Sequence, residues 1–321
     1  MKRVLFACGG TGGHVYPAIA LAEAWESQGH GEAHFAGRAA SMESRLVGTR
    51  WPFHEIVAWP LTRGRLVANL LLPVRLVRSA ISACRAVRRL RPDFVVGTGG
   101  YVSLPVLFAA KIYRIPFILQ EQNAVAGVAN RLASRWAKVA FLADEAASRS
   151  FKCRVVISGN PVRPLPVDQT LPVPEQYAGA KEKILVLGGS QGAKGVNERL
   201  LAALEKMNQR SGLAVVWQTG PAQYEEMKSA AGSSANVHPV AFIDGVYPYL
   251  QHADLVICRA GASTLAEVTA FGRASILIPY PYAAANHQVH NAQALEERGA
   301  AVVELESEPD RLWEKVEKIL G

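Results

Sequence analysis

Cysteine is scarce in this chain of 321 residues, and none of its cysteines is spaced as a C-x-x-C pair. The cysteines are scattered along the chain without regular spacing, so the pattern predicts neither a disulfide scaffold nor a cysteine metal site. A reducing, cytoplasmic compartment is the plain interpretation. The four cysteines are Cys8, Cys84, Cys153 and Cys258.

Long apolar runs are absent as well. No stretch of about 18 uninterrupted apolar residues occurs, which argues against a membrane-spanning helix. The start, MKRVLFACGG, carries two positive charges, but its apolar stretch is too short for a secretory signal and runs into glycines. Half of the residues are hydrophobic and 19% are charged. We therefore expect a globular, cytosolic protein that is long enough for two domains.

Acidic residues are missing between Ile56 and Pro92, a segment that holds eight arginines. Residues 1–160 carry 21 Lys and Arg against 9 Asp and Glu, a net charge of +12, whereas the remainder has a net charge of −4. The asymmetry indicates an anionic partner for the N-terminal half. Arginines mixed with Leu, Val and Ile suit anionic lipid head groups, although a core-facing helix with a solvated basic side gives the same pattern. The arginines expected at a membrane are Arg75, Arg78, Arg85 and Arg88.

One pattern occurs twice along the chain: a short apolar run, a glycine loop and an amphipathic helix. It begins as KRVLFACGGTGGHVYPAIALAEAWESQG at the N-terminus and as EKILVLGGSQGAKGVNERLLAALEKM at Glu182. Further β-rich apolar runs follow each start, and helical periodicity follows each run. Such runs predict parallel strands buried on both faces. The sequence therefore predicts an α/β protein with two doubly wound parallel-sheet domains, 1–160 and 182–321, joined by a proline-rich linker over 161–181.

Three glycine-rich loops directly follow predicted strands: GGTGGH (9–14), GTGG (97–100) and GGSQGA (188–193). In a parallel sheet, ligands bind beyond the carboxyl ends of the strands, where helix N-termini favour anions. Glycine there either lets the backbone approach a phosphate or permits tight packing, and three equivalent loops favour the phosphate. The dinucleotide fingerprint G-x-G-x-x-G does not fit the loop 9–14, because Val15 stands where its third glycine belongs. The P-loop pattern does not fit the loop 188–193, because Ala193 stands where a glycine must precede the lysine.

A second group of polar residues occurs late in the chain. CRAGASTLAEVTAFG (258–272) predicts a strand, a turn of small residues and a helix that presents Glu267, whose carboxylate suits two ribose hydroxyls. The segment PYPYAAANHQVHNA (279–292) adds His287, Gln288 and Asn291 after another strand, with amides that suit sugar hydroxyls. For any one of these residues alone, a solvated helix face is the better interpretation.

Six segments match one family closely and in order, from the first strand to about residue 305. They are GGTGGHVYPAIALA, GTGGYVSLPVLFAA, EQNAVAGVANRLAS, SGNPVR, LGGSQGAKGVN and ICRAGASTLAEVTAFGRASILIPYPYAAANHQVHNA. Together they resemble the MurG family, the undecaprenyl-diphosphomuramoyl-pentapeptide β-N-acetylglucosaminyltransferases of peptidoglycan synthesis. The resemblance implies a GT-B fold, in which two Rossmann-like domains face a central cleft. It also implies inverting transfer of N-acetylglucosamine from UDP-GlcNAc to the 4-hydroxyl of the muramoyl sugar of lipid I, giving lipid II.

The resemblance implies roles for the residues at matching positions. Donor contacts would come from Asn123, Arg163, Ser190, Gln191, the backbone at Ile243, Glu267, Gln288 and Asn291. Acceptor contacts would come from Thr11, Gly12, Gly13, His14, Gly99, Gly100, Tyr101 and Asn130. The implied partners are UDP-GlcNAc, a lipid-linked muramoyl-pentapeptide and an anionic membrane surface, with no nucleic acid. The implied location is peripheral, on the cytoplasmic face of a bacterial plasma membrane.

Glycosyl transfer from a nucleotide sugar requires deprotonation of the acceptor hydroxyl and stabilisation of the leaving diphosphate. Many such enzymes hold a metal with D-x-D, which this sequence lacks, so we expect neither a metal nor a cofactor. His14 begins the first helix, whose positive dipole end favours the neutral imidazole that a general base requires. A phosphate contact is the alternative role for His14, and Glu121 is the alternative base.

Two positions depart from the family pattern. Gln120 stands where HEQN usually has histidine, and Ala285 stands where an aspartate usually precedes NHQ, so neither position carries an ionisable group. The chain ends at DRLWEKVEKILG, with little left to form the helix that commonly crosses back in GT-B folds. Two other functions stay open: another membrane-associated GT-B glycolipid transferase, and a catalytically weak nucleotide-sugar-binding protein.

Overall fold

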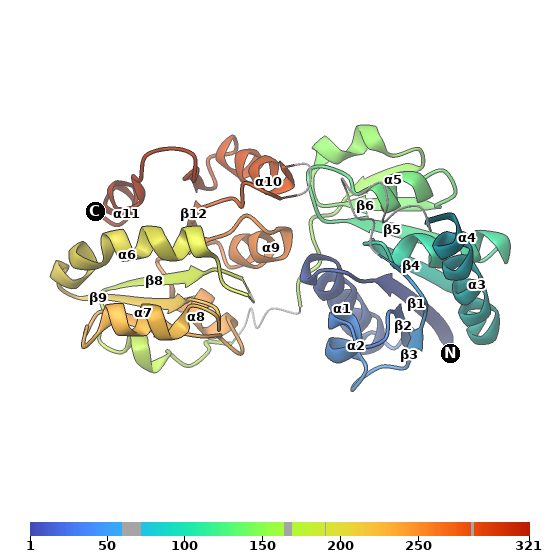
Figure 1. Cartoon of the computed structure of the whole chain (residues 1–321), viewed down its shortest axis with the longest axis horizontal. Helices are drawn as coiled ribbons and strands as arrows, with labels where there is room; N and C mark the ends of the chain where they lie inside the picture. Colours follow the sequence, from blue (N-terminus) through green and yellow to red (C-terminus); the bar gives the residue numbers. More distant parts are fainter. Residues whose placement is uncertain (60–71, 164–168, 190, 284–285) are drawn as a thin grey trace. The chain divides into compact units, whose positions relative to one another are not determined.

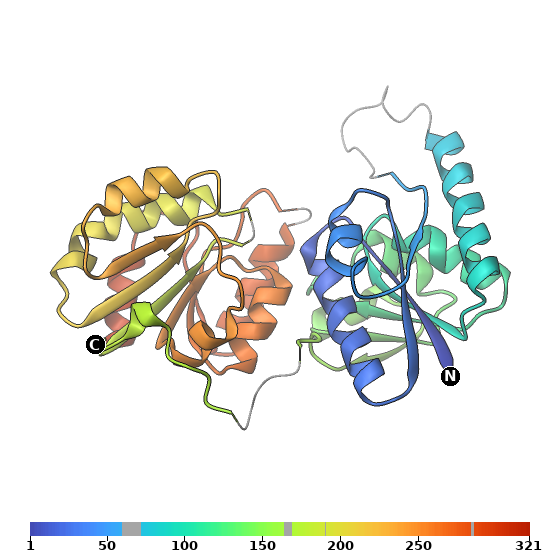
Figure 2. The ribbon, with the colours of Figure 1, turned by 90° about the horizontal axis from the view of Figure 1, so that it is seen from below.

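The chain divides into two compact units, Met1–Leu165 (the N-terminal unit) and Pro166–Gly321 (the C-terminal unit). Each is a parallel β-sheet with helices on both faces (Figures 1 and 2). The predicted class, two doubly wound α/β domains, is confirmed. The structure is a computed structural model, and it describes residues 1–59, 72–163, 169–189, 191–283 and 286–321.

The sheet of the N-terminal unit has seven strands in the order β3-β2-β1-β4-β5-β6-β7, and neighbouring strands pair in parallel. The strands are β1 (Lys2–Cys8), β2 (Gly31–Gly37), β3 (Phe53–Glu55), β4 (Phe94–Gly99), β5 (Phe117–Glu121), β6 (Val139–Leu142) and β7 (Arg154–Ile157). The helices are α1 (Gly12–Ser27), α2 (Met42–Val47), α3 (Leu72–Leu90), α4 (Ser103–Ile112), α5 (Val128–Ala133) and the 3₁₀ helix η2 (Glu145–Ser150).

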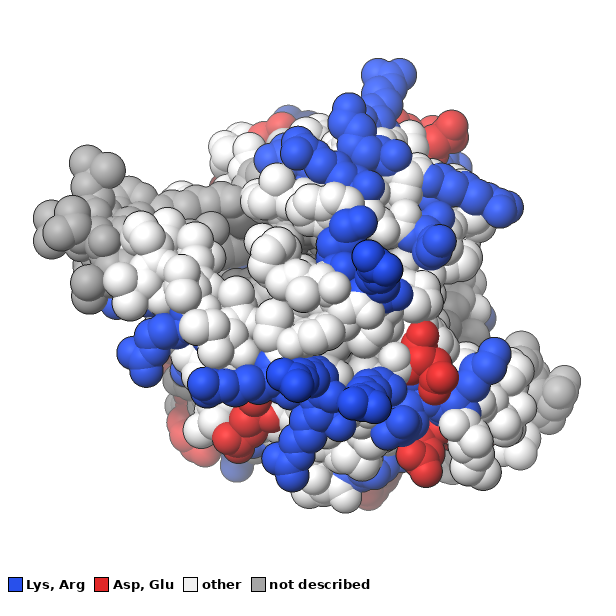
Figure 3. All heavy atoms as spheres, turned by 90° about the vertical axis from the view of Figure 1, so that its right-hand side faces the viewer, with Lys and Arg blue, Asp and Glu red and all other residues white. Residues whose placement is uncertain are grey.

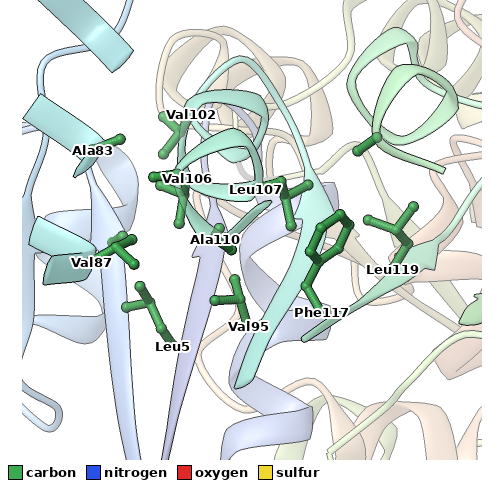
Figure 4. Packing of buried hydrophobic residues seen from close by; sticks show 14 of the residues in the cluster. Leu5, Ala83, Val87, Val95, Val102, Val106, Leu107, Ala110, Phe117 and Leu119 are labelled. Atoms are coloured by element: carbon green, nitrogen blue, oxygen red, sulfur yellow. The ribbon is translucent and has the colours of Figure 1, made fainter. Parts of the chain in front are cut away.

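Successive residues of β1 pack on opposite faces of this sheet. Leu5 lies in a buried cluster with Val87 of α3 and Leu107 of α4 (Figure 4). The next residue, Phe6, lies in a second buried cluster with Val15 of α1. This alternation explains why the strand reads as a continuous apolar run rather than as an alternating one.

The sheet of the C-terminal unit has six parallel strands in the order β10-β9-β8-β11-β12-β13. The strands are β8 (Glu182–Leu187), β9 (Leu213–Gln218), β10 (Val237–Val240), β11 (Leu255–Cys258), β12 (Ala274–Leu277) and β13 (Val302–Val303). The helices are α6 (Lys194–Gln209), α7 (Tyr224–Ala231), α8 (Tyr247–His252), α9 (Ala262–Ala270), α10 (His287–Glu296), α11 (Leu312–Leu320) and the 3₁₀ helix η3 (Glu175–Tyr177).

The end of the proline-rich segment packs on the C-terminal unit. Tyr177 is buried there, and its hydroxyl donates a hydrogen bond to the backbone oxygen of Ile184 at 3.1 Å. The last residues of the predicted linker therefore belong to the C-terminal unit in the structure. None of the described helices is both long and apolar enough to cross a membrane.

Each sheet has one switch point, where the chain stops adding strands on one side and continues on the other. These points lie between β1 and β4 and between β8 and β11. Ligands of doubly wound sheets bind beyond the carboxyl ends of the strands at such points. The loops 9–11 and 100–102 lie at the first switch point, and residues 188–189, 191–193 and 259–261 lie at the second.

Candidate functional site

The loops after β1 and β4 touch each other through their glycines. A Cβ built on Gly100, whose φ is +84°, would lie 2.0 Å from the carbonyl oxygen of Gly9. One built on Gly10, whose φ is +91°, would lie 2.9 Å from the ring of Tyr101. Packing and backbone conformation alone therefore explain why Gly100 and Gly10 carry no side chain.

Gly13, in the first turn of α1, has no such packing reason. A Cβ there would meet only Oγ1 of Thr11 at 3.7 Å, which is an ordinary contact. Thr11 is the N-cap of α1, and its side chain makes no capping hydrogen bond. Because the first N–H groups of a helix have no partner within the helix, a glycine there favours close approach of an anion.

His14 lies in the first turn of α1, against the end of β4. Its Nδ1 lies 3.0 Å from Oε1 of Gln122, which directly follows β5. A Cβ on Gly99 would lie 3.0 Å from the imidazole ring. The hydroxyl of Thr98 donates to the backbone oxygen of His14 at 2.8 Å. Strands β1, β4 and β5 thus bring together His14, Gly99 and Gln122, of which sequence reasoning missed Gln122.

Glu121, the last residue of β5, is 1% exposed and is surrounded by N–H donors. Its carboxylate accepts from Nδ2 of Asn130 and from the backbone N–H of Gly127, each at 3.0 Å. It also accepts from the backbone and side-chain nitrogens of Asn123, each at 3.3 Å. A carboxylate bonded in this way holds the loop before α5 in place, so its geometry suits a structural role better than that of a base.

Arg38 places a guanidinium beside Tyr101, in the loop that follows β4. Burial and the Glu43 carboxylate raise the pKa of Tyr101, and a hydrogen bond from the Arg38 side chain opposes this rise. Tyr101 therefore keeps its hydroxyl proton at neutral pH. Arg38 directly follows β2 and is exposed.

Two residues predicted to bind the donor lie in the N-terminal unit. Asn123 belongs to the loop that Glu121 organises. Arg163 places its guanidinium 5.7 Å from the centre of the Tyr16 ring on α1. The other described donor residues lie in the C-terminal unit, and Ser190 is outside the described residues.

Gln218, at the end of β9, ties together the loops of the C-terminal switch point. Its Nε2 donates to the backbone oxygen of Gly189 at 2.8 Å, and its Oε1 accepts from the backbone N–H of Ile243 at 3.0 Å. The backbone of Ile243 is predicted to contact the sugar-nucleotide donor, but its N–H is already bonded within the protein. Gln191 is exposed in the loop after β8, and a Cβ on its neighbour Gly192 would lie 2.1 Å from the oxygen of Thr219.

The remaining residues predicted to bind the sugar-nucleotide donor lie on the helices that follow β11 and β12. Glu267 is half-buried in the second turn of α9. Nδ2 of Asn291 donates to the backbone oxygen of Ala260 at 3.2 Å, and Oε1 of Gln288 accepts from the backbone N–H of Tyr280 at 2.9 Å. Glu267 thus lies on α9, whereas Gln288 and Asn291 lie on α10 and bond to the backbone of the segments that follow β12 and β11.

Arg259, which directly follows β11, adds a guanidinium that sequence reasoning did not single out. Its Nη1 lies 2.5 Å from Oε1 of Glu306 and donates to the backbone oxygen of Ile278 at 3.0 Å. A Cβ on Gly195, in the first turn of α6, would lie 2.0 Å from the same Glu306 oxygen. The Arg259 guanidinium is thus fixed near the starts of α6 and α9 as one partner of an ion pair with Glu306.

The two cysteines that end β1 and β11 are chemically inert. Burial raises the pKa of both thiols, and that of Cys258 rises to about 12. Neither Cys8 nor Cys258 is a thiolate at neutral pH, so neither offers a nucleophile. Within the described ranges, no three His, Cys, Asp or Glu side chains gather as a metal site requires.

The two units match the two domains of one enzyme family. Residues 4–142 match the glycosyltransferase family 28 N-terminal domain, and residues 183–321 match the glycosyltransferase family 28 C-terminal domain. The chain belongs to glycosyltransferase family 28.

Curated relatives within this family share one name: UDP-N-acetylglucosamine–N-acetylmuramyl-(pentapeptide) pyrophosphoryl-undecaprenol N-acetylglucosamine transferase. The protein of this name from Desulforudis audaxviator is 39% identical, and the alignment covers 95% of this chain and 86% of the relative. That from Coxiella burnetii is also 39% identical, over 94% of this chain and 85% of the relative.

Solved structures agree with this membership. The crystal structure of Acinetobacter baumannii MurG is similar with a TM-score of 0.77 and 33% identity, covering 100% of this chain and 90% of that one. The glycotransferase of kitacinnamycin, at 15% identity and a TM-score of 0.74 over 99% of this chain and 90% of its own, shows the fold alone. The resemblance to the MurG family is confirmed, and with it the assignment to the glycosyltransferases.

Proposed function

We propose that this chain transfers N-acetylglucosamine, with inversion, from UDP-GlcNAc to the 4-hydroxyl of the muramoyl sugar of lipid I, giving lipid II. The shared name of its relatives supports the reaction. The observation in this chain that supports it best is the start of α1, where His14 is held beside Gly13. A site for phosphate and a basic nitrogen thus lie at the same helix terminus. The acceptor requires both, because it carries a diphosphate and its sugar hydroxyl is the nucleophile.

On the acceptor side, the diphosphate binds the N–H groups of Gly12 and Gly13, because the N–H of His14 already donates to the backbone oxygen of Thr11 at 3.1 Å. The side chain of His14 removes the proton of the attacking hydroxyl. On the donor side, the loop after β8 and the start of α9 hold the UDP diphosphate. A Cβ on Gly261, the N-cap of α9, would meet no atom within 4 Å, so the backbone is open to a ligand there. Arg259 offsets the charge that develops on the leaving group, and Glu267 accepts from the ribose hydroxyls.

UDP release tests the reaction. The protein is incubated with UDP-GlcNAc, with and without a soluble lipid I analogue, and the other common nucleotide sugars serve as controls. Release that needs both substrates supports the proposal. Faster release with another sugar nucleotide would identify a different glycolipid transferase, and UDP-GlcNAc binding without acceptor-dependent release would identify a binding protein. Either of these two results would contradict the proposed reaction.

We also propose that the N-terminal unit docks on an anionic membrane surface through α3. Four apolar side chains of this helix, Val74, Leu76, Val77 and Ile81, are between 46% and 58% exposed. Arg78, Arg85 and Arg88 are exposed among them, and Arg75 is half-buried, with its guanidinium 5.9 Å from the centre of the Trp59 ring. Exposed apolar groups framed by arginines suit the boundary between head groups and acyl chains.

The neighbouring helix α4 extends this surface. It packs against α3 and exposes Phe108 and Ile112 beside Lys111. The face of the N-terminal unit seen in Figure 3 shows many Lys and Arg side chains, with uncharged residues between them and few Asp or Glu side chains. A lipid-linked acceptor keeps its diphosphate at the bilayer surface, so docking through this face brings enzyme and acceptor together.

Vesicle binding tests the docking face. Reversing the charge of Arg75, Arg78 and Arg85 to Glu is expected to abolish binding to anionic liposomes and to leave UDP-GlcNAc affinity unchanged. The matched control reverses three exposed lysines of the C-terminal unit, Lys206, Lys228 and Lys318, which changes the net charge equally. Equal loss in both triple variants, or wild-type binding that ignores lipid charge and salt, would contradict a specific electrostatic face.

A further inference from the structure

His14 and Gln122 form a buried contact whose direction is set by the surroundings of the amide. Gln122 is 3% exposed, and its Oε1 lies 3.0 Å from Nδ1 of His14. Its Nε2 donates to the backbone oxygen of Thr98 at 2.7 Å. The same Nε2 also donates to the backbone oxygen of Gln120 at 3.3 Å and contacts Oε1 of the Gln120 side chain. All the partners on the nitrogen side of this amide are therefore acceptors.

The opposite orientation of the amide is excluded by these acceptors. It would place the amide oxygen against the carbonyl oxygens of Thr98 and Gln120, which are themselves acceptors. The amide oxygen must therefore face His14. Because an amide oxygen only accepts, Nδ1 of His14 carries a proton, and in the neutral imidazole the lone pair lies on Nε2.

We propose that Gln122 is a positioning residue that fixes His14 as the Nδ1–H tautomer and so makes Nε2 the basic nitrogen of the reaction. This inference rests on the proposed function. In the step, Nε2 takes the proton of the acceptor hydroxyl, the hydroxyl oxygen bonds to C1 of N-acetylglucosamine, and the bond from C1 to the diphosphate breaks. The electron pair leaves on UDP, and the imidazolium that forms keeps its Nδ1–H bond to Gln122.

The position of the ring is fixed as firmly as its tautomer. Gly99 has a φ of +104°, and a Cβ there would lie 3.0 Å from both Cε1 and Nδ1 of the imidazole. The hydroxyl of Thr98 holds the backbone of His14 at 2.8 Å, and the carbonyl of the same residue holds Gln122. One residue of β4 thus aligns both partners, which explains how an imidazole on a helix start keeps one orientation.

A neutral amide serves this role differently from a carboxylate. A carboxylate at the same place would also fix the proton on Nδ1, but its charge would stabilise the imidazolium and hold the base protonated to higher pH. An amide orients the ring without that effect. The choice of Gln at position 122 therefore suits a base that must be neutral before each turnover.

Two variants separate these effects. Gln122→Met removes the acceptor at similar volume, and kcat is expected to fall, though by less than the roughly 10²–10⁴-fold of losing the base. Gln122→Glu keeps an acceptor but adds charge, so the acid limb of the rate profile is expected to move to higher pH, with activity partly recovered there. Affinity for UDP-GlcNAc is expected to stay constant in both. Gln28→Met is the matched control, because Gln28 contacts His30 Nε2 at 2.9 Å on the exposed surface.

The tautomer itself is read by nuclear magnetic resonance of protein with nitrogen-15-labelled histidine, without any turnover. We expect Nδ1–H with unprotonated Nε2 for His14 in the wild type and a mixture of tautomers in Gln122→Met. An Nε2–H tautomer in the wild type, or an unchanged spectrum in Gln122→Met, would overturn the assignment. If the spectra agree but His14→Ala retains kcat, the tautomer assignment stands and the proposed base fails.

Discussion

Nδ2 of Asn130 donates at 3.0 Å both to the carboxylate of Glu121 and to the backbone oxygen of Gln120. The carboxylate and the amide are each 1% exposed. This contact joins the first turn of α5 to the end of β5. The next residue along the chain is Gln122, which contacts His14. A buried charge with several N–H partners stabilises the fold, because its loss leaves those donors unpaired.

Replacing Glu121 by Ala is therefore expected to lower the free energy of unfolding by at least about 1.5–3 kcal/mol, the usual range for one hydrogen bond to a charged group. Urea unfolding measures this change. Glu145→Ala, at the exposed start of η2, is the control and is expected to be near neutral. An unchanged urea midpoint together with a large loss of kcat would return Glu121 to the role of base.

The role of His14 is tested by its removal. His14→Ala is expected to lower kcat by roughly 10²–10⁴-fold, the usual effect of losing a general base, while donor affinity stays near wild type. Steady-state kinetics and calorimetric titration with UDP-GlcNAc measure the two quantities. If kcat stays within a few-fold of wild type and only the acceptor KM rises, His14 contacts phosphate instead.

The fold could be predicted from the sequence because its signals are local. Each strand is a short apolar run whose neighbouring residues face opposite clusters, as Leu5 and Phe6 do, and each run is followed by helical periodicity. Glycine loops and the proline-rich segment mark the boundaries. Such patterns can be recognised without knowing which strands are neighbours in the sheet.

The polar contacts of the site depend on which strands are neighbours, and local sequence patterns do not show this order. His14 and Gln122 are 108 positions apart, and they meet only because β1, β4 and β5 are adjacent in the sheet. Gln218 and Arg259 likewise act between loops from different strands. The sequence could nominate His14 from its place at a helix start, but no spacing rule identifies its partner.

Donor binding is expected to depend on Glu267. Glu267→Ala removes a charged acceptor from two ribose hydroxyls, and one such bond contributes about 1.5–3 kcal/mol, or roughly 10- to 100-fold in Kd. Calorimetry with UDP-GlcNAc measures the change, and Glu226→Ala on the exposed side of α7 is the control. Equal affinity in wild type and Glu267→Ala would remove Glu267 from the donor site.

A histidine pair next to α3 makes stability depend on pH. Nδ1 of His34 lies 3.1 Å from Nε2 of His54, and Glu32 lies 3.6 Å from the other nitrogen of His34. Burial, then His34 and then Arg89, lower the pKa of His54. The folded protein therefore binds a proton at His54 less readily than the unfolded chain does.

Stability is accordingly expected to be complete above the unfolded histidine pKa of about 6.5 and to fall as the pH drops below it, levelling off beneath the lowered pKa of the folded protein. Unfolding midpoints measured across this pH range test the expectation. His54→Gln is expected to reduce the dependence and to leave the part due to His238, whose pKa burial also lowers. His30→Gln, on the exposed surface, is expected to retain all of it. The same slope in both variants would show that other groups cause it.

Two glycines of the first switch point are expected to respond oppositely to alanine. Gly100→Ala places a Cβ 2.0 Å from the oxygen of Gly9 at a φ of +84°, so the variant is expected to be strongly destabilised. Gly13→Ala adds a Cβ that meets only Oγ1 of Thr11, at an ordinary contact distance of 3.7 Å. Alanine in a helix is more stable than glycine by roughly 0.5–1 kcal/mol. The thermal midpoint of Gly13→Ala is therefore expected to stay constant or rise, while the acceptor KM rises because the added methyl group occupies the approach to the first turn.

Affinity of Gly13→Ala for UDP-GlcNAc, measured in the same preparation, serves as the internal control. A Gly13→Ala enzyme with unchanged acceptor KM would show that no ligand approaches the backbone there, and the anion site at the start of α1 would have to be abandoned.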